Sequence, residues 1–102
     1  MSKPADYFIF NRVYEIGFCE YATDTVAIID GDSTQFERAY TNVKPDEAVN
    51  YAISEAVEFA KGVLGPDATA IIDTNGSPYV DWRLFNAEPY EEIEEVITDG
   101  NE

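Results

Sequence analysis

The sequence contains no histidine and only one cysteine, Cys19. Without histidine, the common pairing of a nucleophile with an imidazole base is unavailable, and so are most zinc sites. A single cysteine excludes an intramolecular disulfide and is typical of a reducing compartment. These two shortages argue against most catalytic centres and against a secreted domain held together by disulfides.

Basic residues are also scarce, because 6 Lys and Arg stand against 21 Asp and Glu and leave a formal net charge of -15 at pH 7. Such a surface repels phosphate, so direct binding to nucleic acid or to an anionic membrane is disfavoured. Glycine-rich phosphate-binding motifs are missing as well, since neither glycine turn, at residues 31–33 or 75–77, is followed by Gly-Lys-Ser/Thr. A basic protein is the favoured partner.

The N-terminus lacks the apolar region and small-residue cleavage site of a signal peptide, and no window approaches the length of a membrane span. These features favour a cytoplasmic protein. With 102 residues, of which 45% are hydrophobic, the chain is large enough to form one core without disulfides. We predict a single domain over residues 1–97 and a polar acidic tail over residues 98–102.

The most regular segment is residues 44–65, where apolar residues recur at helical spacing on one broad side. Pro45 suits the first helical position, and Gly65 followed by Pro66 indicates the end. Four alanines spaced four residues apart form a flat strip, which predicts close packing on a neighbouring layer. The residues expected on the buried side are Ala48, Val49, Ala52, Ile53, Ala56, Val57, Phe59, Ala60, Val63 and Leu64.

The remaining elements predict an α+β fold. Strands are expected over residues 7–21, with an irregularity near Asn11 or Gly17, and over residues 25–30, 35–40, 68–73 and 79–85. Turns are expected at residues 31–33 and 74–76, with the last strand returning antiparallel to residues 68–73. A short acidic helix is expected over residues 88–97. The order β-β-β-α-β-β-α predicts a mainly antiparallel sheet of about five strands with the long helix on one face.

Carboxylates are the only abundant groups with catalytic or metal-binding chemistry. With 21 acids in 102 residues, any acidic pair is expected by chance, so paired carboxylates do not indicate catalysis. Asp30, Asp32, Asp73 and Asn75 resemble fragments of a calcium loop, but the spacing required of an EF-hand places Leu84 where a carboxylate is needed. Turn formation explains the same residues. We predict no catalytic residues, no metal site and no cofactor.

The acidic surface is the strongest functional signal in the sequence. Residues 91–102 contain no Lys or Arg, and Lys61 is the single cation between residues 45 and 65. Like charges one helical turn apart cost only a few tenths of a kcal/mol per pair, so a charged helix by itself needs no functional explanation. The total charge makes the acids candidates for partner binding, and the predicted residues are Glu47, Glu55, Glu58, Glu88, Glu91, Glu92, Glu95 and Asp99.

In charge, length and expected α+β layout, the chain resembles phage-encoded inhibitors that imitate DNA, among them anti-restriction proteins, uracil-DNA glycosylase inhibitors and some anti-CRISPR proteins. The resemblance implies an inhibitor or decoy that blocks a basic nucleic-acid-binding protein. Such a protein would gain fast, salt-sensitive association from its acidic surface.

Two other interpretations remain open. In the first, the protein is a non-catalytic interaction or adaptor domain, as a monomer or a homodimer, that binds through an aromatic strand face formed by Tyr79, Asp81, Arg83 and Phe85. The acids then serve solubility. In the second, the chain is an ordinary protein of a salt-adapted organism. Binding that is nearly indifferent to salt would identify the first, and unfolding in low salt would identify the second.

Overall fold

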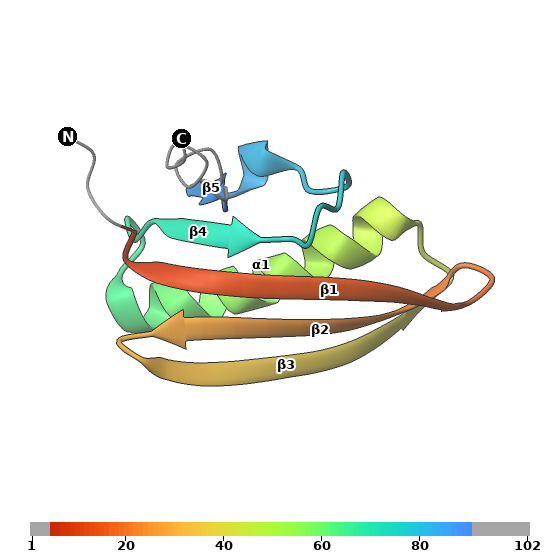
Figure 1. Cartoon of the computed structure of the whole chain (residues 1–102), viewed down its shortest axis with the longest axis horizontal. Helices are drawn as coiled ribbons and strands as arrows, with labels where there is room; N and C mark the ends of the chain where they lie inside the picture. Colours follow the sequence, from red (N-terminus) through yellow and green to blue (C-terminus); the bar gives the residue numbers. More distant parts are fainter. Residues whose placement is uncertain (1–4, 91–102) are drawn as a thin grey trace, which may run out of the picture.

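The computed structural model describes residues 5–90. Within them, three long strands precede a long helix, and two short strands and a 3-10 turn follow it (Figure 1). The predicted α+β class, with one long helix packed on a five-stranded sheet, is confirmed. The elements are β1 (Tyr7–Gly17), β2 (Glu20–Ile29), β3 (Asp32–Thr41), α1 (Pro45–Leu64), β4 (Ala70–Asp73), η1 (Trp82–Leu84) and β5 (Ala87–Pro89).

The sheet is mixed and has the strand order β3-β2-β1-β4-β5. The β1–β2 and β2–β3 pairs are antiparallel and long, whereas the β1–β4 and β4–β5 pairs are parallel and short. Because β4 runs parallel to β1, the chain reaches it through a crossover connection that contains α1. The antiparallel part of the sheet therefore carries most of the strand pairing.

Tight turns set the register of the antiparallel part. β2 and β3 are joined at Asp30 and Gly31, whose φ values of 53° and 85° fit the type I′ turn that favours a two-residue hairpin. The predicted turn at residues 31–33 was therefore placed slightly too late. Residues 7–21 are not one strand, because the chain reverses at Phe18 and Cys19. The predicted irregularity at Gly17 is confirmed by a register shift between Glu15 and Gly17.

The core lies between α1 and one face of the sheet. Alternate residues of β1 and β2, such as Ile9 and Ala27, are buried against the helix, as the two-residue period of a strand requires. The alanine strip of α1 is fully buried, which confirms its predicted role. The prediction was wrong at Phe59, Val63 and Leu64, which are at least 36% exposed because α1 covers the sheet only with the rest of that side.

The chain after β4 differs most from the prediction. Residues 79–85 do not form an antiparallel strand, because they include η1, and the fifth strand is β5, parallel to β4. Local hydrogen bonds explain the difference: the Asp81 carboxylate accepts the backbone N–H of Arg83 and starts the 3-10 turn. Residues 88 and 89 belong to β5, so no helix begins at residue 88, and residues 91–97 of that predicted helix lie outside the described residues.

Within residues 5–90, no helix combines the length and hydrophobicity that crossing a membrane requires.

Candidate functional site

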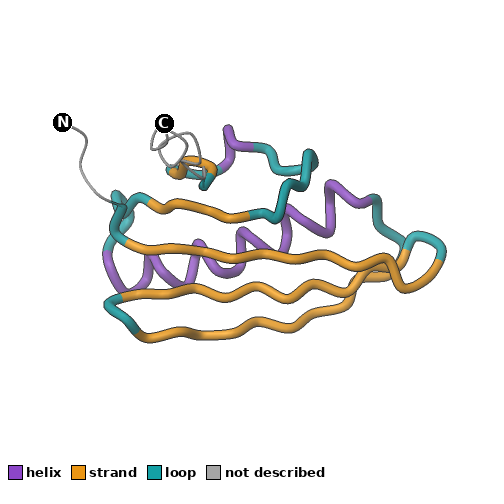
Figure 2. The backbone as a smooth tube through the Cα atoms, viewed as in Figure 1, coloured by secondary structure: helices purple, strands orange, loops and turns teal. Residues whose placement is uncertain are grey.

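A cleft lies beside β1, beyond the point where β4 ends. The β1–β4 register stops at Phe10 opposite Asp73, although β1 continues to Gly17. The chain then turns away from β1 in the loop after β4 (Figure 2), where Asn75 and Gly76 both have positive φ. In the described part of the chain, the edge of β1 from residue 11 to residue 17 therefore has no strand partner on the β4 side.

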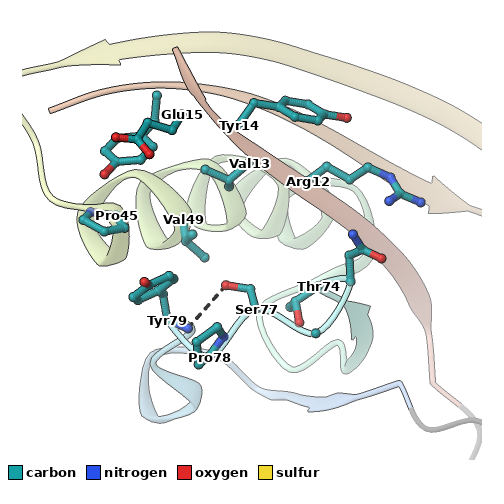
Figure 3. A pocket seen from close by; sticks show the side chains of 13 residues that line it. Arg12, Val13, Tyr14, Glu15, Pro45, Val49, Thr74, Ser77, Pro78 and Tyr79 are labelled. Carbon is teal, nitrogen blue, oxygen red and sulfur yellow. Dashed lines mark hydrogen bonds between the residues drawn. The ribbon is translucent and has the colours of Figure 1, made fainter. Parts of the chain in front are cut away.

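The cleft has a volume of about 390 Å³ and is bounded by β1, the start of α1 and the loop after β4. Figure 3 shows Val13 of β1 pointing toward Val49 of α1, with Tyr79 on the loop side. Its lining therefore combines apolar side chains with the polar backbone of an unpaired strand edge. The lining residues are Arg12, Val13, Tyr14, Glu15, Tyr21, Pro45, Val49, Thr74, Asn75, Gly76, Ser77, Pro78 and Tyr79.

Asn50 holds the loop side of the cleft in place. Its side-chain amide nitrogen donates to the carbonyl oxygens of Asp46 (2.8 Å) and Tyr79 (3.0 Å), and its amide oxygen accepts the Asp81 N–H (2.9 Å). One side chain of α1 thus fixes the backbone on both sides of Val80. The sequence pattern does not reveal this role, because Tyr79 and Asp81 lie 29 and 31 residues from Asn50 along the chain.

The cleft provides neutral polar groups and one carboxylate, with no basic side chain other than Arg12. Partial burial raises the pKa of the Tyr21 phenol, and the negative charge of Glu15 raises it further. Tyr21 is therefore a neutral hydroxyl at physiological pH and can both donate and accept a hydrogen bond. This set suits binding of a polar segment.

The predicted partner-binding acids on α1 have different surroundings. Glu47 accepts the backbone N–H of Lys44 at 2.8 Å and so caps the start of the helix. Glu55 forms an ion pair with Arg38 of β3 at 2.6 Å, which neutralises part of the charge on that side. Glu58 is exposed. Its negative charge helps to raise the pKa of the Tyr7 phenol.

The acids do not gather on one surface within the described residues. Glu88 lies opposite Ile71 in the β5–β4 register, and Ile71 is on the face of the sheet that α1 does not cover. The three predicted acids of α1 are on the helix side of the sheet. Glu88 is therefore separated from them by the sheet, and the remaining predicted acids, Glu91, Glu92, Glu95 and Asp99, lie outside the described residues.

The expected aromatic strand face does not exist in the arrangement that the alternation predicted. Phe85 is 9% exposed and belongs to the core, whereas Tyr79 is 46% exposed and lines the cleft. Asp81 and Arg83 form a two-point ion pair with both nitrogen–oxygen distances at 2.9 Å. This bonding lowers the pKa of Asp81 and raises that of Arg83. The four residues face different surroundings because the 3-10 turn breaks the strand alternation.

An apolar surface that sequence reasoning did not assign lies on the uncovered face of the sheet. We call it the open-face patch, and it consists of Phe8, Phe10, Val26, Ile28 and Ile71. The signal was present in residues 7–10, where both alternating sets are apolar. One helix can bury only one of these sets, so the other must remain on the opposite face.

Among the described residues, no three Cys, Asp or Glu side chains lie close enough together to hold a metal ion. Comparisons of the chain with protein-family models, with curated protein sequences and with solved structures found no match.

Proposed function

We propose that the protein is an acidic, non-catalytic inhibitor or decoy that occupies the cationic surface of a nucleic-acid-binding protein, as anti-restriction and anti-CRISPR inhibitors do. The observation that carries the proposal is the net charge of -15 on a well-cored domain. Residues 5–90 include five Lys and Arg, and two of these, Arg38 and Arg83, are already paired with carboxylates. Few cations are left to weaken the negative field.

The electrostatics of such a chain favour rapid capture of a basic partner. A protein field of one sign accelerates encounter with an oppositely charged surface, and added salt screens it over a Debye length of about 8 Å at physiological ionic strength. Association should therefore slow steeply as salt is added. A DNA duplex should compete for the same partner surface.

The test is capture of partners from host lysate at low salt, elution with high salt, and competition of each eluted protein against a DNA duplex. The variant Glu88→Lys/Glu92→Lys/Glu95→Lys is expected to lose inhibition. The matched control is Asp32→Lys/Glu37→Lys/Asp67→Lys, which changes the charge equally at exposed positions that are not among the predicted partner-binding acids. Full inhibition by the first variant would exclude the proposed role of these acids. If both variants lose inhibition equally, net charge alone explains the inhibition, and the positions of the acids do not matter.

A second candidate function is an interaction domain that binds through the cleft. The observation that favours it is the unpaired edge of β1 beside a cleft that contains Tyr79. An exposed strand edge can accept an extended peptide as an additional strand, with backbone hydrogen bonds supplying affinity and adjacent pockets supplying specificity. This site replaces the strand face expected over residues 79–85.

Binding of this kind should respond weakly to salt and strongly to Tyr79→Ala. The control is Tyr51→Ala, because Tyr51 is similarly exposed, at 51%, but lies outside the cleft. Isothermal titration of the captured partner with both variants separates the two functions. Equal affinities of the two variants would contradict binding in the cleft.

A further inference from the structure

The open-face patch spans three strands. Phe8 lies opposite Ile28 of β2 on one side and Ile71 of β4 on the other, and Phe10 lies opposite Val26. Phe8 and Phe10 are 42% and 41% exposed. Single exposed apolar residues are ordinary on protein surfaces, but a contiguous apolar area across several strands marks an interaction surface.

The described chain ends on this patch. The backbone N–H of Tyr90 donates to the carbonyl oxygen of Ile72 at 3.0 Å, which extends the sheet pairing past β5. The Tyr90 side chain lines a shallow pocket of about 240 Å³ together with Phe8, Phe10 and Ile71. Residue 91 therefore continues from the rim of the patch, and twelve residues follow Tyr90.

The sequence that follows has a matching apolar side. Ile93, Val96 and Ile97 come three, six and seven residues after Tyr90, which is the spacing of one side of a helix. Seven helical residues extend about 10 Å, and two interstrand spacings amount to nearly the same length at ~4.8 Å each. A segment of this length reaches from β4 to β2, which is the width of the patch.

We propose that residues 91–97 cover the open-face patch, with Ile93, Val96 and Ile97 against Phe8, Phe10 and Ile28. The segment is an intramolecular occupant that begins at the patch, so its contact requires little loop-closure entropy. A second copy of the protein would have to displace it. Removal of apolar area from water drives the contact.

Charge opposes this contact. Asp73 and Glu88 lie on the same side of the sheet as the patch, and residues 91–95 add four glutamates and no cation. Like charges in proximity repel, and salt screens their repulsion. Covering of the patch is therefore strengthened by added salt, whereas binding to a basic partner is weakened by it.

The contact also brings together acids that the described residues leave separate. Glutamates on the outer side of the segment come to lie beside Glu88 and form one acidic surface over the sheet face. This functional consequence rests on the proposed function, but the contact itself does not. Observation of the contact without any salt-sensitive partner would refute only the inhibitor role, and inhibition without the contact would refute only this proposal.

The experiment is NMR of the full-length protein with labelled isoleucine and valine methyl groups and labelled phenylalanine rings. Nuclear Overhauser effects are expected from Ile93 and Ile97 methyls to the rings of Phe8 and Phe10, and the cross-peaks should strengthen with salt. The variant Ile93→Asp/Ile97→Asp should lose them and should bind a hydrophobic dye. The control Glu92→Gln/Glu95→Gln, which keeps the apolar side, should retain the cross-peaks.

Absence of these cross-peaks in a folded monomer would overturn the proposal. Cross-peaks that appear only between differently labelled copies, together with a mass that rises with concentration, would overturn it in favour of a homodimer through the patch. Sheet signals that are unchanged in the double aspartate variant would show that the fold is intact, so that loss of the contact is not mistaken for unfolding.

Discussion

The two faces of the sheet differ in a way that hydrophobicity alone does not explain. The face under α1 buries Asn11, Thr23 and Thr25, whereas the opposite face leaves Phe8 and Phe10 more than 40% exposed. The alanine strip lets α1 lie close to the covered face, where Tyr7, Ile9 and Ile29 are also buried. The opposite apolar set, which includes the two phenylalanines, has no helix over it within the described residues.

The largest expected difference between the faces is the loss of stability when an isoleucine on each is replaced by alanine. Ile53 of α1 is fully buried against the sheet, while Ile16 of β1 is 58% exposed and lies outside the open-face patch. Ile53→Ala should lower the free energy of unfolding by about 2–5 kcal/mol, because it removes buried methyl groups and leaves a cavity. Ile16→Ala should cost roughly 1 kcal/mol or less. Urea unfolding measures both, and equal losses would contradict the one-sided core.

The next largest difference in stability between the two faces should come from a buried and an exposed hydrogen bond. Asn11 donates to the Thr25 hydroxyl at 2.9 Å beneath α1, and the Asn11 amide oxygen has no partner among the described residues. Thr25→Val should destabilise the fold by about 1–3 kcal/mol, because the buried amide then loses its acceptor. On the open face, Gln35 donates to Asp24 at 2.8 Å in contact with solvent. Gln35→Ala should change stability by about 0.5 kcal/mol or less.

A second substitution tests the explanation. Adding Asn11→Leu to Thr25→Val replaces both polar partners with apolar groups of similar size, which can be nearly neutral. The double variant should therefore be more stable than Thr25→Val alone in the same urea titration. If the loss of stability in the double variant equals the sum of the losses in the two single variants, Asn11 stabilises the core through other contacts.

The ion pair at the rim of the covered face should contribute less. Arg38 and Glu55 are 2.6 Å apart, but their side chains are 47% and 34% exposed. Solvent-exposed pairs of this kind contribute about 0.2–1 kcal/mol. A double-mutant cycle of Arg38→Ala and Glu55→Ala should yield a coupling energy in that range that shrinks with added salt. A large coupling that is indifferent to salt would mean that the pair is more deeply buried than its exposed fraction indicates.

The smallest effect is confined to alkaline pH. Burial raises the pKa of the Tyr7 phenol above its usual value of about 10, and the charges of Asp6 and Glu58 raise it further. The folded state therefore favours the neutral phenol, so its contribution to stability is fully present below pH 10 and is lost as pH rises through the folded pKa. Tyr7→Phe should make thermal stability less sensitive to pH above 10. An identical pH profile in the variant would contradict this linkage.

Local patterns were sufficient to predict much of the fold. The 3.6-residue period and the terminal prolines and glycine located α1, and apolar alternation located the long strands. The prediction of a strand over residues 79–85 was wrong because hydrogen bonds to the side chains of Asp81 and Asn50 hold this backbone in another conformation. The bond to Asp81 is local, so the sequence offered a sign of it. The bond to Asn50 comes from α1, and no local pattern indicates it.

The candidate sites depended even more on tertiary structure. The cleft exists because β4 has four residues and β1 has eleven, and no local pattern specifies how far two parallel strands overlap. The acids were easy to identify, but their distribution over two sides of the sheet depends on strand order. The open-face patch could have been inferred by counting apolar strand faces against the one long helix available to cover them.

The pairing of β1 with β4 also has a consequence for how the chain folds. Tyr7 lies opposite Ala70, so the centre of the sheet joins segments 63 residues apart, whereas the two hairpins join neighbours. Contacts between distant segments form slowly because loop closure costs conformational entropy. During synthesis, β1 leaves the ribosome well before residues 70–73 and keeps an unpaired edge meanwhile. We expect the speed with which α1 forms and delivers β4 to govern how much nascent chain is lost to aggregation.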